Sequence, residues 1–255
     1  MATIQIQPTQ DVSMRTSGFL GQTVWDTAHD SSTGVNFSNS HAYSDAASDI
    51  TVRLGVRYTT SFGSSFFQIY RLYQDYDLSS IPGGSTITAA VINIKGATWG
   101  VVAGGAGENT NWDTIIIEGT YGSTLADTDL DSFTGFEAGW DGDAGDTDIV
   151  TYTSENTAWN ESAYNQWTVN STGIAALQSA LNGGTRFKTV VMEEEHDYKD
   201  VAPTSPPTYF AGTYYTIRDS GNEPYIEITY TPPPAAGKIT LNSGKLTLTS
   251  AKIQL

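Results

Sequence analysis

The chain has 255 residues and no cysteine, and its 12 Lys and Arg against 28 Asp and Glu give a formal net charge of −16. The absence of cysteine excludes disulfides, thiol catalysis and thiolate metal sites, and the negative charge disfavours binding to nucleic acid or to an anionic membrane. The sequence begins without a basic, apolar leader and contains no run of about 20 apolar residues, so we expect no signal peptide and no membrane span.

Short alternating segments, separated by Gly, Pro, Ser and Asn, predict strands along most of the chain. We expect them at residues 3–7, 67–78, 86–95, 113–120, 148–152, 166–169, 187–193, 214–218 and 225–230. Residues 11–49 are rich in Ser, Asn, Gly and Asp, which is typical of long surface loops around short strands. In residues 67–78 both alternating sets contain large apolar side chains, so both faces of that strand should be covered.

Only residues 171–181 have helical periodicity. Ile174, Leu177 and Leu181 recur at helical spacing behind a Ser-Thr start and before two glycines that would end a helix. Many short strands with one short helix predict an all-β protein, an antiparallel two-sheet sandwich that occupies residues 1–231.

The composition changes after residue 231. Residues 232–236 are Pro-Pro-Pro-Ala-Ala, a stiff linker. Residues 237–255 repeat a seven-residue unit of small residue, Lys, aliphatic, polar, Leu, polar and Ser, which predicts three very short strands with turns at the Ser-Gly and Ser-Ala junctions.

Such a tail should not fold alone. Each buried aliphatic contributes about 1.5–3 kcal/mol, whereas ordering the backbone costs about 1–2 kcal/mol per residue, so the strands need the edge of another subunit or copies of themselves. We therefore predict an assembly tail. Its apolar residues are Ile239, Leu241, Leu246, Leu248, Ile253 and Leu255. The alternative is a strand that folds back onto its own domain.

Residues 71–90 read Arg-Leu-Tyr-Gln-Asp-Tyr-Asp-Leu-Ser-Ser-Ile-Pro-Gly-Gly-Ser-Thr-Ile-Thr-Ala-Ala. This stretch resembles the signature of the DNRLRE-type jelly-roll domains, and residues 167–170 and 224–230 agree with later segments of that family in the same order. The resemblance spans residues 1–231. It implies a jelly-roll β-sandwich similar to carbohydrate-binding modules, of a kind found in hypothetical proteins of phages and archaeal viruses.

Residues 141–148, Asp-Gly-Asp-Ala-Gly-Asp-Thr-Asp, gather four carboxylates in a Gly-loosened segment. Carboxylate oxygens are the hard ligands that Ca²⁺ prefers. The segment therefore predicts a calcium site made of Asp141, Asp143, Asp146 and Asp148. Because it lacks the bidentate Glu of an EF-hand, a solvated acidic loop is the alternative.

Four tryptophans lie among Gly, Asn and Asp residues typical of loops, where exposed indoles can stack on sugar rings. These candidate glycan-binding residues are Trp99, Trp112, Trp140 and Trp159. The alternative is an anchoring role in the core, the commoner fate of a large aromatic side chain. Trp167, inside an expected strand, should be buried.

No phosphate-binding glycine loop, Gly-x-Ser-x-Gly elbow or zinc-protease spacing occurs, so we expect no enzyme activity. A polysaccharide-cleaving enzyme has the least support, because 28 acids place some carboxylate pair near any spacing. The assembly tail and the missing signal favour a phage virion protein, in the head or in the tail or fibre, assembled in the host cytoplasm.

Its partners would be copies of itself and other virion proteins, with a trimer favoured by the resemblance to fibre proteins. The alternative is a calcium-assisted carbohydrate-binding module or receptor-binding domain that contacts surface glycans.

Overall fold

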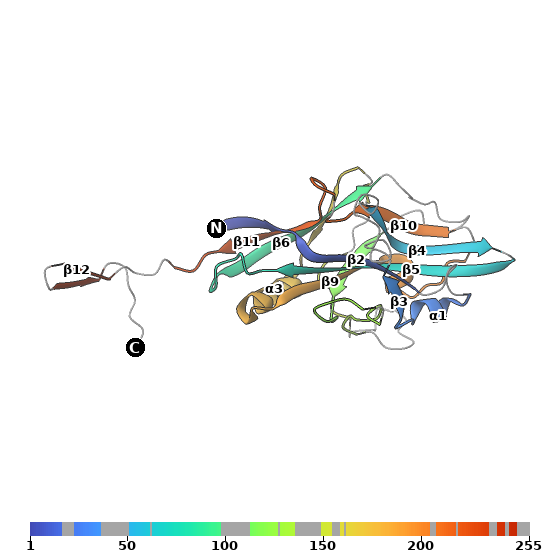
Figure 1. Ribbon diagram of the computed structural model, residues 1–255, viewed down its shortest axis with the longest axis horizontal. Helices are drawn as coiled ribbons and strands as arrows, with labels where there is room; N and C mark the ends of the chain where they lie inside the picture. The colour runs from blue at the N-terminus through green and yellow to red at the C-terminus, as the bar shows by residue number, and fades with distance from the viewer. Residues whose placement is uncertain are drawn as a thin grey trace.

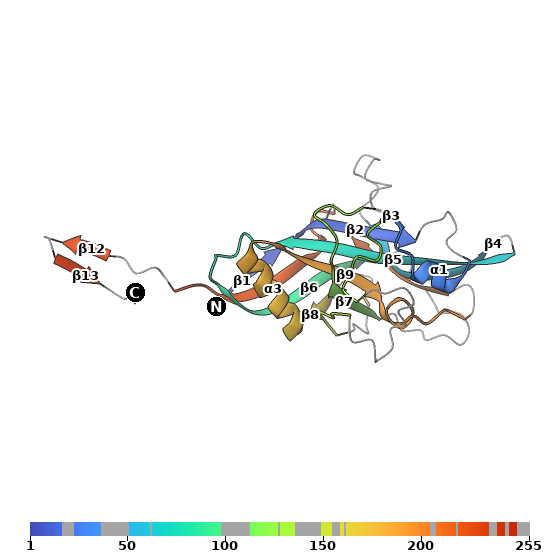
Figure 2. The ribbon, with the colours of Figure 1, turned by 90° about the horizontal axis from the view of Figure 1, so that it is seen from below.

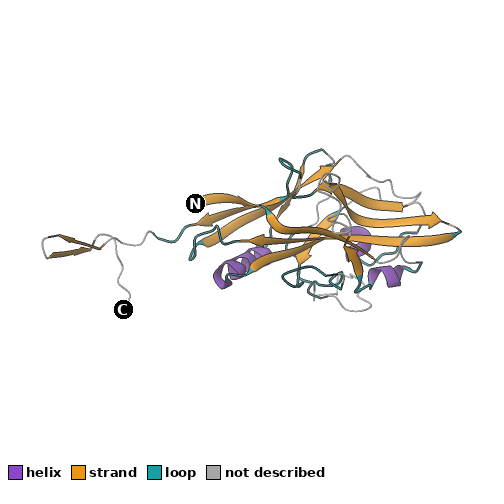
Figure 3. Cartoon of the chain, in the orientation of Figure 1, coloured by secondary structure: helices purple, strands orange, loops and turns teal. Residues whose placement is uncertain are grey.

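The computed structural model describes residues 1–16, 23–36, 51–61, 63–97, 113–126, 128–135, 149–154, 159–160, 162–204, 208–217, 219–234, 239–242 and 245–248. They form an elongated β-sandwich and a C-terminal hairpin that lies apart from it (Figure 1). Strands dominate, and helices are few and short (Figure 3). No helix in this part of the chain is long and apolar enough to cross a bilayer.

The first sheet has four antiparallel strands in the order β1-β11-β6-β8. They are β1 (Ala2–Ile6), β11 (Tyr225–Thr231), β6 (Thr86–Ala97) and β8 (Tyr164–Thr168). In β11, Ile226 and Ile228 are buried, whereas the alternate residues Tyr225 and Glu227 are half-buried on the outer face. This alternation matches a strand with one face on the core.

The second sheet is built around a long central strand, β5. Its strands are β3 (Gly34–Asn36), β2 (Pro8–Thr16), β5 (Ser64–Asp77), β4 (Thr51–Ser61), β10 (Thr208–Tyr215), β9 (Arg186–Glu193) and β7 (Thr114–Glu118). One edge of β5 pairs with β2. Along the opposite edge, residues 64–70 pair with β4 and residues 72–77 pair with β9. The other edge of β9 pairs with β7. The end of β6 pairs with β10, so β6 joins the two sheets.

The main core lies between the sheets. Its largest side chain is Trp167 of β8, which packs in the same cluster as Tyr76 and Phe187 of the second sheet. Helix α3 (Ser171–Gly183) contributes Leu177 and lies beside β6 and β9 (Figure 2). The predicted burial of Trp167 is therefore confirmed.

The outer face of the second sheet is also covered. Segment 121–133 packs onto it through Leu130 and Phe133, which cluster with Tyr73. At the far end, the short helix α1 (Trp25–His29) packs Trp25 against Phe67 of β5. Both faces of β5 are thus covered, as its sequence predicts.

The predicted helix is confirmed and runs slightly further than its periodicity indicates. The Asn170 side chain caps its start by accepting a hydrogen bond from Gly173 N at 2.9 Å. Gly184 ends it in a left-handed conformation, φ 62°. Gly173 is needed at the first turn because a Cβ there would stand 2.4 Å from Val169 Cγ1.

Several sequence-based predictions were incomplete or wrong. Strands β2 and β4 were not predicted, and α1 and the π-helix η1 (Glu194–Tyr198) add to the single helix expected. The strand expected at 148–152 is wrong over the described residues 149–154, which make only isolated bridges through Thr151 and Thr153. The strand expected at 214–218 instead spans Thr208–Tyr215, because a turn begins at Thr216.

The tail forms β12 (Ile239–Asn242) and β13 (Lys245–Leu248), an antiparallel pair on either side of the predicted Ser-Gly turn. Leu241 stands opposite Leu246, and Ile239 opposite Leu248. Over the described residues this hairpin pairs only with itself. Two of the three predicted strands are therefore present, and the third, with Ile253 and Leu255, lies outside the described residues.

Candidate functional sites

Most of the predicted calcium-binding and glycan-binding residues lie outside the described part of the chain. These are the calcium candidates Asp141, Asp143, Asp146 and Asp148 and the tryptophans Trp99, Trp112 and Trp140. Trp159 is described. It is half-buried against the main core, with its ring 6.1 Å from that of Trp167. This position suits an anchoring tryptophan at the edge of the core.

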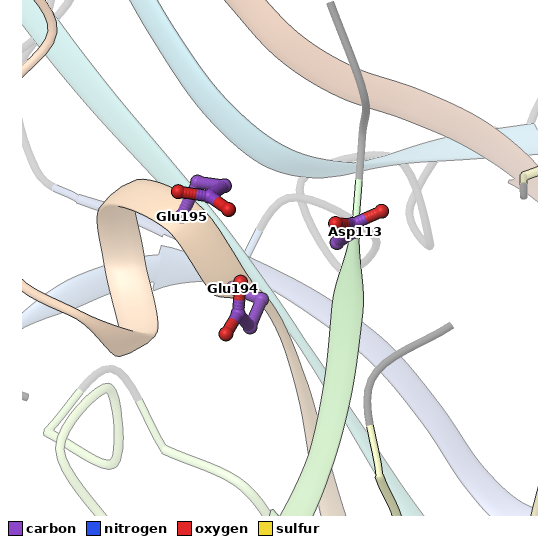
Figure 4. A group of neighbouring side chains, drawn as sticks. All are labelled: Asp113, Glu194 and Glu195. Atoms are coloured by element: carbon purple, nitrogen blue, oxygen red, sulfur yellow. The ribbon is translucent and has the colours of Figure 1, made fainter. Parts of the chain in front are cut away.

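A different acidic cluster forms where β7 begins and η1 follows β9 (Figure 4). One carboxylate oxygen from each of Asp113, Glu194 and Glu195 lies within 4.8 Å of the others. Asp113 and Glu194 are nearly buried, and their backbones are joined by a 2.9 Å hydrogen bond from Glu194 N to Asp113 O. Three carboxylates so close can hold a divalent cation.

The same cluster already has a cation of its own. Lys199 Nζ lies 2.8 Å from Glu194 Oε2 and 3.2 Å from Glu195 Oε1, and the lysine side chain is 39% exposed. A metal ion at this position would have to displace the ammonium group. The geometry is therefore that of a partly neutralised acidic cluster.

Glu193 organises the backbone beneath this cluster. It is fully buried, and its carboxylate accepts hydrogen bonds from the backbone N–H groups of Glu195, His196 and Asp197 at 2.9, 2.7 and 3.1 Å. Burial raises the pKa of Glu193 to about 8, although the three N–H groups favour its charged form. This capping holds the first turn of η1 in place.

A buried ionic network connects η1 to the second sheet and to α1. Arg71 of β5 donates to Asp197 from Nε at 3.0 Å and from Nη2 at 2.7 Å, and its Nη1 donates to Leu130 O at 2.8 Å. His29 Nε2 lies 2.8 Å from Asp197 O. Because these groups bond to one another, the network serves to position η1 and α1.

A cleft of about 430 Å³ lies between α3 and the start of β9. Its three charged residues all have partners within the protein. Glu118 accepts from Tyr152 Oη at 3.0 Å, Lys188 donates to Gly122 O at 3.2 Å, and Arg186 pairs with Asp75 at 3.0 Å. The cleft therefore presents hydroxyl groups to a ligand, whereas its charged groups are already paired within the protein.

A second hollow, of about 440 Å³, lies on the outer face of the first sheet. It is lined by Gln5, Gln7, Tyr164, Glu223 and Tyr225. The two tyrosine rings are 5.3 Å apart at 66° to each other, and Tyr164 Oη donates to Glu223 O at 3.1 Å. A sugar-like polar ring could stack on the tyrosine rings. The amide groups of Gln5 and Gln7 could donate and accept hydrogen bonds around it.

Sequence reasoning missed both the acidic cluster and the tyrosine hollow. The β7–β9 register, which sets Thr114 opposite Glu193, brings Asp113 to η1, and nothing local in the sequence indicates it. Tyr225 begins a predicted strand, but Tyr164 lies before the strand predicted at residues 166–169, and alternation within one strand does not show what a residue meets on another strand. No protein-family model matches the chain, and no curated protein is significantly similar to it.

Proposed function

We propose that the protein is a non-enzymatic structural subunit of a phage virion, a component of the head surface or of the tail or fibre. Its β-sandwich is displayed outward, and its C-terminal tail joins it to neighbouring subunits. The resemblance of residues 71–90 to a domain type found in phage proteins supports this assignment.

The observation that carries the proposal is the C-terminal hairpin. It stands apart from the sandwich in both views (Figures 1 and 2) and pairs only with itself over the described residues. An isolated two-stranded hairpin is at best marginally stable in water. The hairpin thus needs a further surface, and neighbouring subunits supply one in an assembly.

Two measurements test the function. Sedimentation of the intact chain should give a multiple of 27.4 kDa, whereas the chain that ends at residue 231 should be a folded monomer. Mass spectrometry of gradient-purified virions should find the chain among the particle proteins. An intact chain that sediments as a monomer and is absent from virions would contradict the proposal.

The tyrosine hollow favours a second function, binding of surface glycans, assisted by calcium at residues 141–148. Replacing Tyr164 or Tyr225 by Ala should weaken glycan binding by about two- to tenfold, since one aromatic contact contributes about 0.5–1.5 kcal/mol. Thr229→Ala is the control, because Thr229 lies on β11 with Tyr225 but outside the hollow. Equal binding by all three variants on a glycan array would remove this function from the hollow.

A further inference from the structure

The two strands of the hairpin divide their residues cleanly between two faces. Residues directly opposite in an antiparallel pair share a face, and alternate residues change face. The register therefore groups the four aliphatic residues on one face, Ile239, Leu241, Leu246 and Leu248. The other face holds Thr240, Asn242, Lys245 and Thr247.

The sandwich offers this apolar face no matching surface over the residues described. There the exposed large hydrophobic residues are Met1, Val24 and Val201. Val24 precedes α1, at the opposite end of the sandwich from the tail (Figure 1), and Val201 follows Asp200, which bonds to Trp25 of α1. Met1 is a single residue beside Ala2, which pairs with Tyr230 near the point where the tail leaves β11, and it is separate from the two valines. The three residues therefore do not form one patch that would cover four aliphatic residues, on this copy or on another.

The charges allow two such faces to meet. The tail contains Lys238, Lys245 and Lys252 and no acidic residue. Register places Lys245 on the polar face with Asn242, so it stays outside a seam formed by the apolar faces. Two or three hairpins can therefore associate without burying that charge.

Three consecutive prolines, Pro232 to Pro234, follow the last strand of the sandwich and precede the hairpin in the sequence. Pro233 lies over the turn at Gly84, where an added Cβ would stand 3.6 Å from Pro233 Cβ, and its neighbours Pro232 and Pro234 are exposed. Consecutive prolines form a stiff, extended spacer. Several sandwiches can thus surround one joint made of tails.

On this basis we propose that the apolar face of the β12–β13 hairpin binds the same face of the hairpin in another copy of the chain. The chains are joined tail to tail in a closed symmetric oligomer, and the sandwiches do not contact one another. This inference rests on the proposed assembly function and specifies its contact: a neighbouring tail rather than a neighbouring sandwich.

Matched substitutions in the intact chain test the face. Leu241→Asp should reduce the sedimenting mass to that of the 27.4 kDa monomer. Thr240→Asp adds the same charge one residue away, on the opposite face, and should leave the oligomer intact. The inference is wrong if both variants dissociate equally or if both remain oligomeric.

A mixing experiment separates the inference from the proposed function. Labelled chain ending at residue 231 is added to the intact oligomer. Tail-to-tail contact excludes the shortened chain, which should sediment alone. Recruitment of the shortened chain would show that tails bind sandwiches. That result would overturn the inference but would still agree with assembly through the tail. If the intact chain is itself monomeric, the proposed assembly function is wrong.

Disulfide trapping gives a third readout, because the chain has no cysteine of its own. Under mild oxidation with diamide, Leu241→Cys should form disulfide-linked dimers on a non-reducing gel, and Thr240→Cys should remain monomeric on that gel. Efficient cross-linking of Thr240→Cys alone would place the polar face in the seam and overturn the inference.

Discussion

Arg71 and Asp197 form an ion pair whose two side chains have no exposed surface, with Nη2 2.7 Å from Oδ1. The pair joins the central strand of the second sheet to η1, which follows β9. A charge left alone in such a site is far less stable than the pair, since it loses water without gaining a partner.

Removing either partner should therefore destabilise the sandwich strongly. We expect Arg71→Ala and Asp197→Ala each to lower the free energy of unfolding by about 3–5 kcal/mol, measured by guanidinium unfolding. The control is Glu195→Ala, which breaks only the half-exposed pair with Lys199, whose side chains are 31% and 39% exposed, and should cost about 0–1 kcal/mol. Equal losses from the buried and the half-exposed pair would contradict this expectation.

Two glycines of α3 should respond in opposite ways to alanine. Gly173→Ala places a methyl group against Val169 Cγ1 and Tyr152 O, so it should destabilise the protein by about 1–3 kcal/mol. Gly183→Ala, where the nearest atom is 3.7 Å away, should stabilise it by about 0.4–1 kcal/mol through helix propensity and a less flexible unfolded chain. Thermal melts of the two variants give the comparison; a stabilising Gly173→Ala would refute the close approach.

Asp11 should make stability depend on pH. Its carboxylate accepts from Gln74 Nε2 at 2.9 Å and from Ile217 N at 3.1 Å, and burial raises its pKa to about 7, from an ordinary value of 3.8. The folded state thus holds a proton that the unfolded state releases, so this contribution to stability is complete below pH 3.8 and is lost as the pH rises through about 7.

Asp11→Asn should remove that slope, about 1.4 kcal/mol per pH unit over the range between the two pKa values. The measurement is the free energy of unfolding from pH 4 to pH 8 in both proteins. Glu193, whose pKa is raised to about 8, should keep its own slope in the variant. Identical pH profiles would show that Asp11 ionises as an exposed carboxylate does.

Calcium binding at residues 141–148 should appear as a lower melting temperature in the presence of a chelator. A ligand held only by the folded state contributes about 2.7 kcal/mol at one hundred times its dissociation constant. Asp143→Asn should abolish the chelator effect, and Asp113→Asn should leave it unchanged. The reverse pattern would move the ion to the cluster of Asp113, Glu194 and Glu195, and no effect in the unmodified chain would favour a solvated acidic loop.

Local pattern was enough to predict the elements whose environment is simple. Strand β11 alternates cleanly between core and outer face, and α3 has both a cap and a terminating glycine. Strand β2 was missed because its buried residues include Asp11 and Ser13, whose partners come from elsewhere: Gln74 for the first and Arg53 O for the second. A polar residue that will be satisfied by a distant strand is indistinguishable, in sequence, from one in a loop.

The same reason explains why the sites could not be predicted from the sequence. Arg71 and Asp197 lie on separate elements, and Asp113 reaches Glu194 only through the β7–β9 register. The tail was predictable because its information is local: a repeat of seven residues, with a turn at Ser-Gly, sets which residues face each other. The register in the structure, Leu241 opposite Leu246, is that of two strands joined at the predicted Ser-Gly turn.

The position of β11 has a mechanical consequence. The tail leaves from the end of this strand, which lies between β1 and β6 and is hydrogen-bonded to both. A pull on the tail along β11 is opposed by bonds perpendicular to the force on both sides, so the two ladders must shear together instead of opening one bond at a time. The sandwich is therefore attached to the tail through an inner strand of its first sheet, and this attachment resists tension.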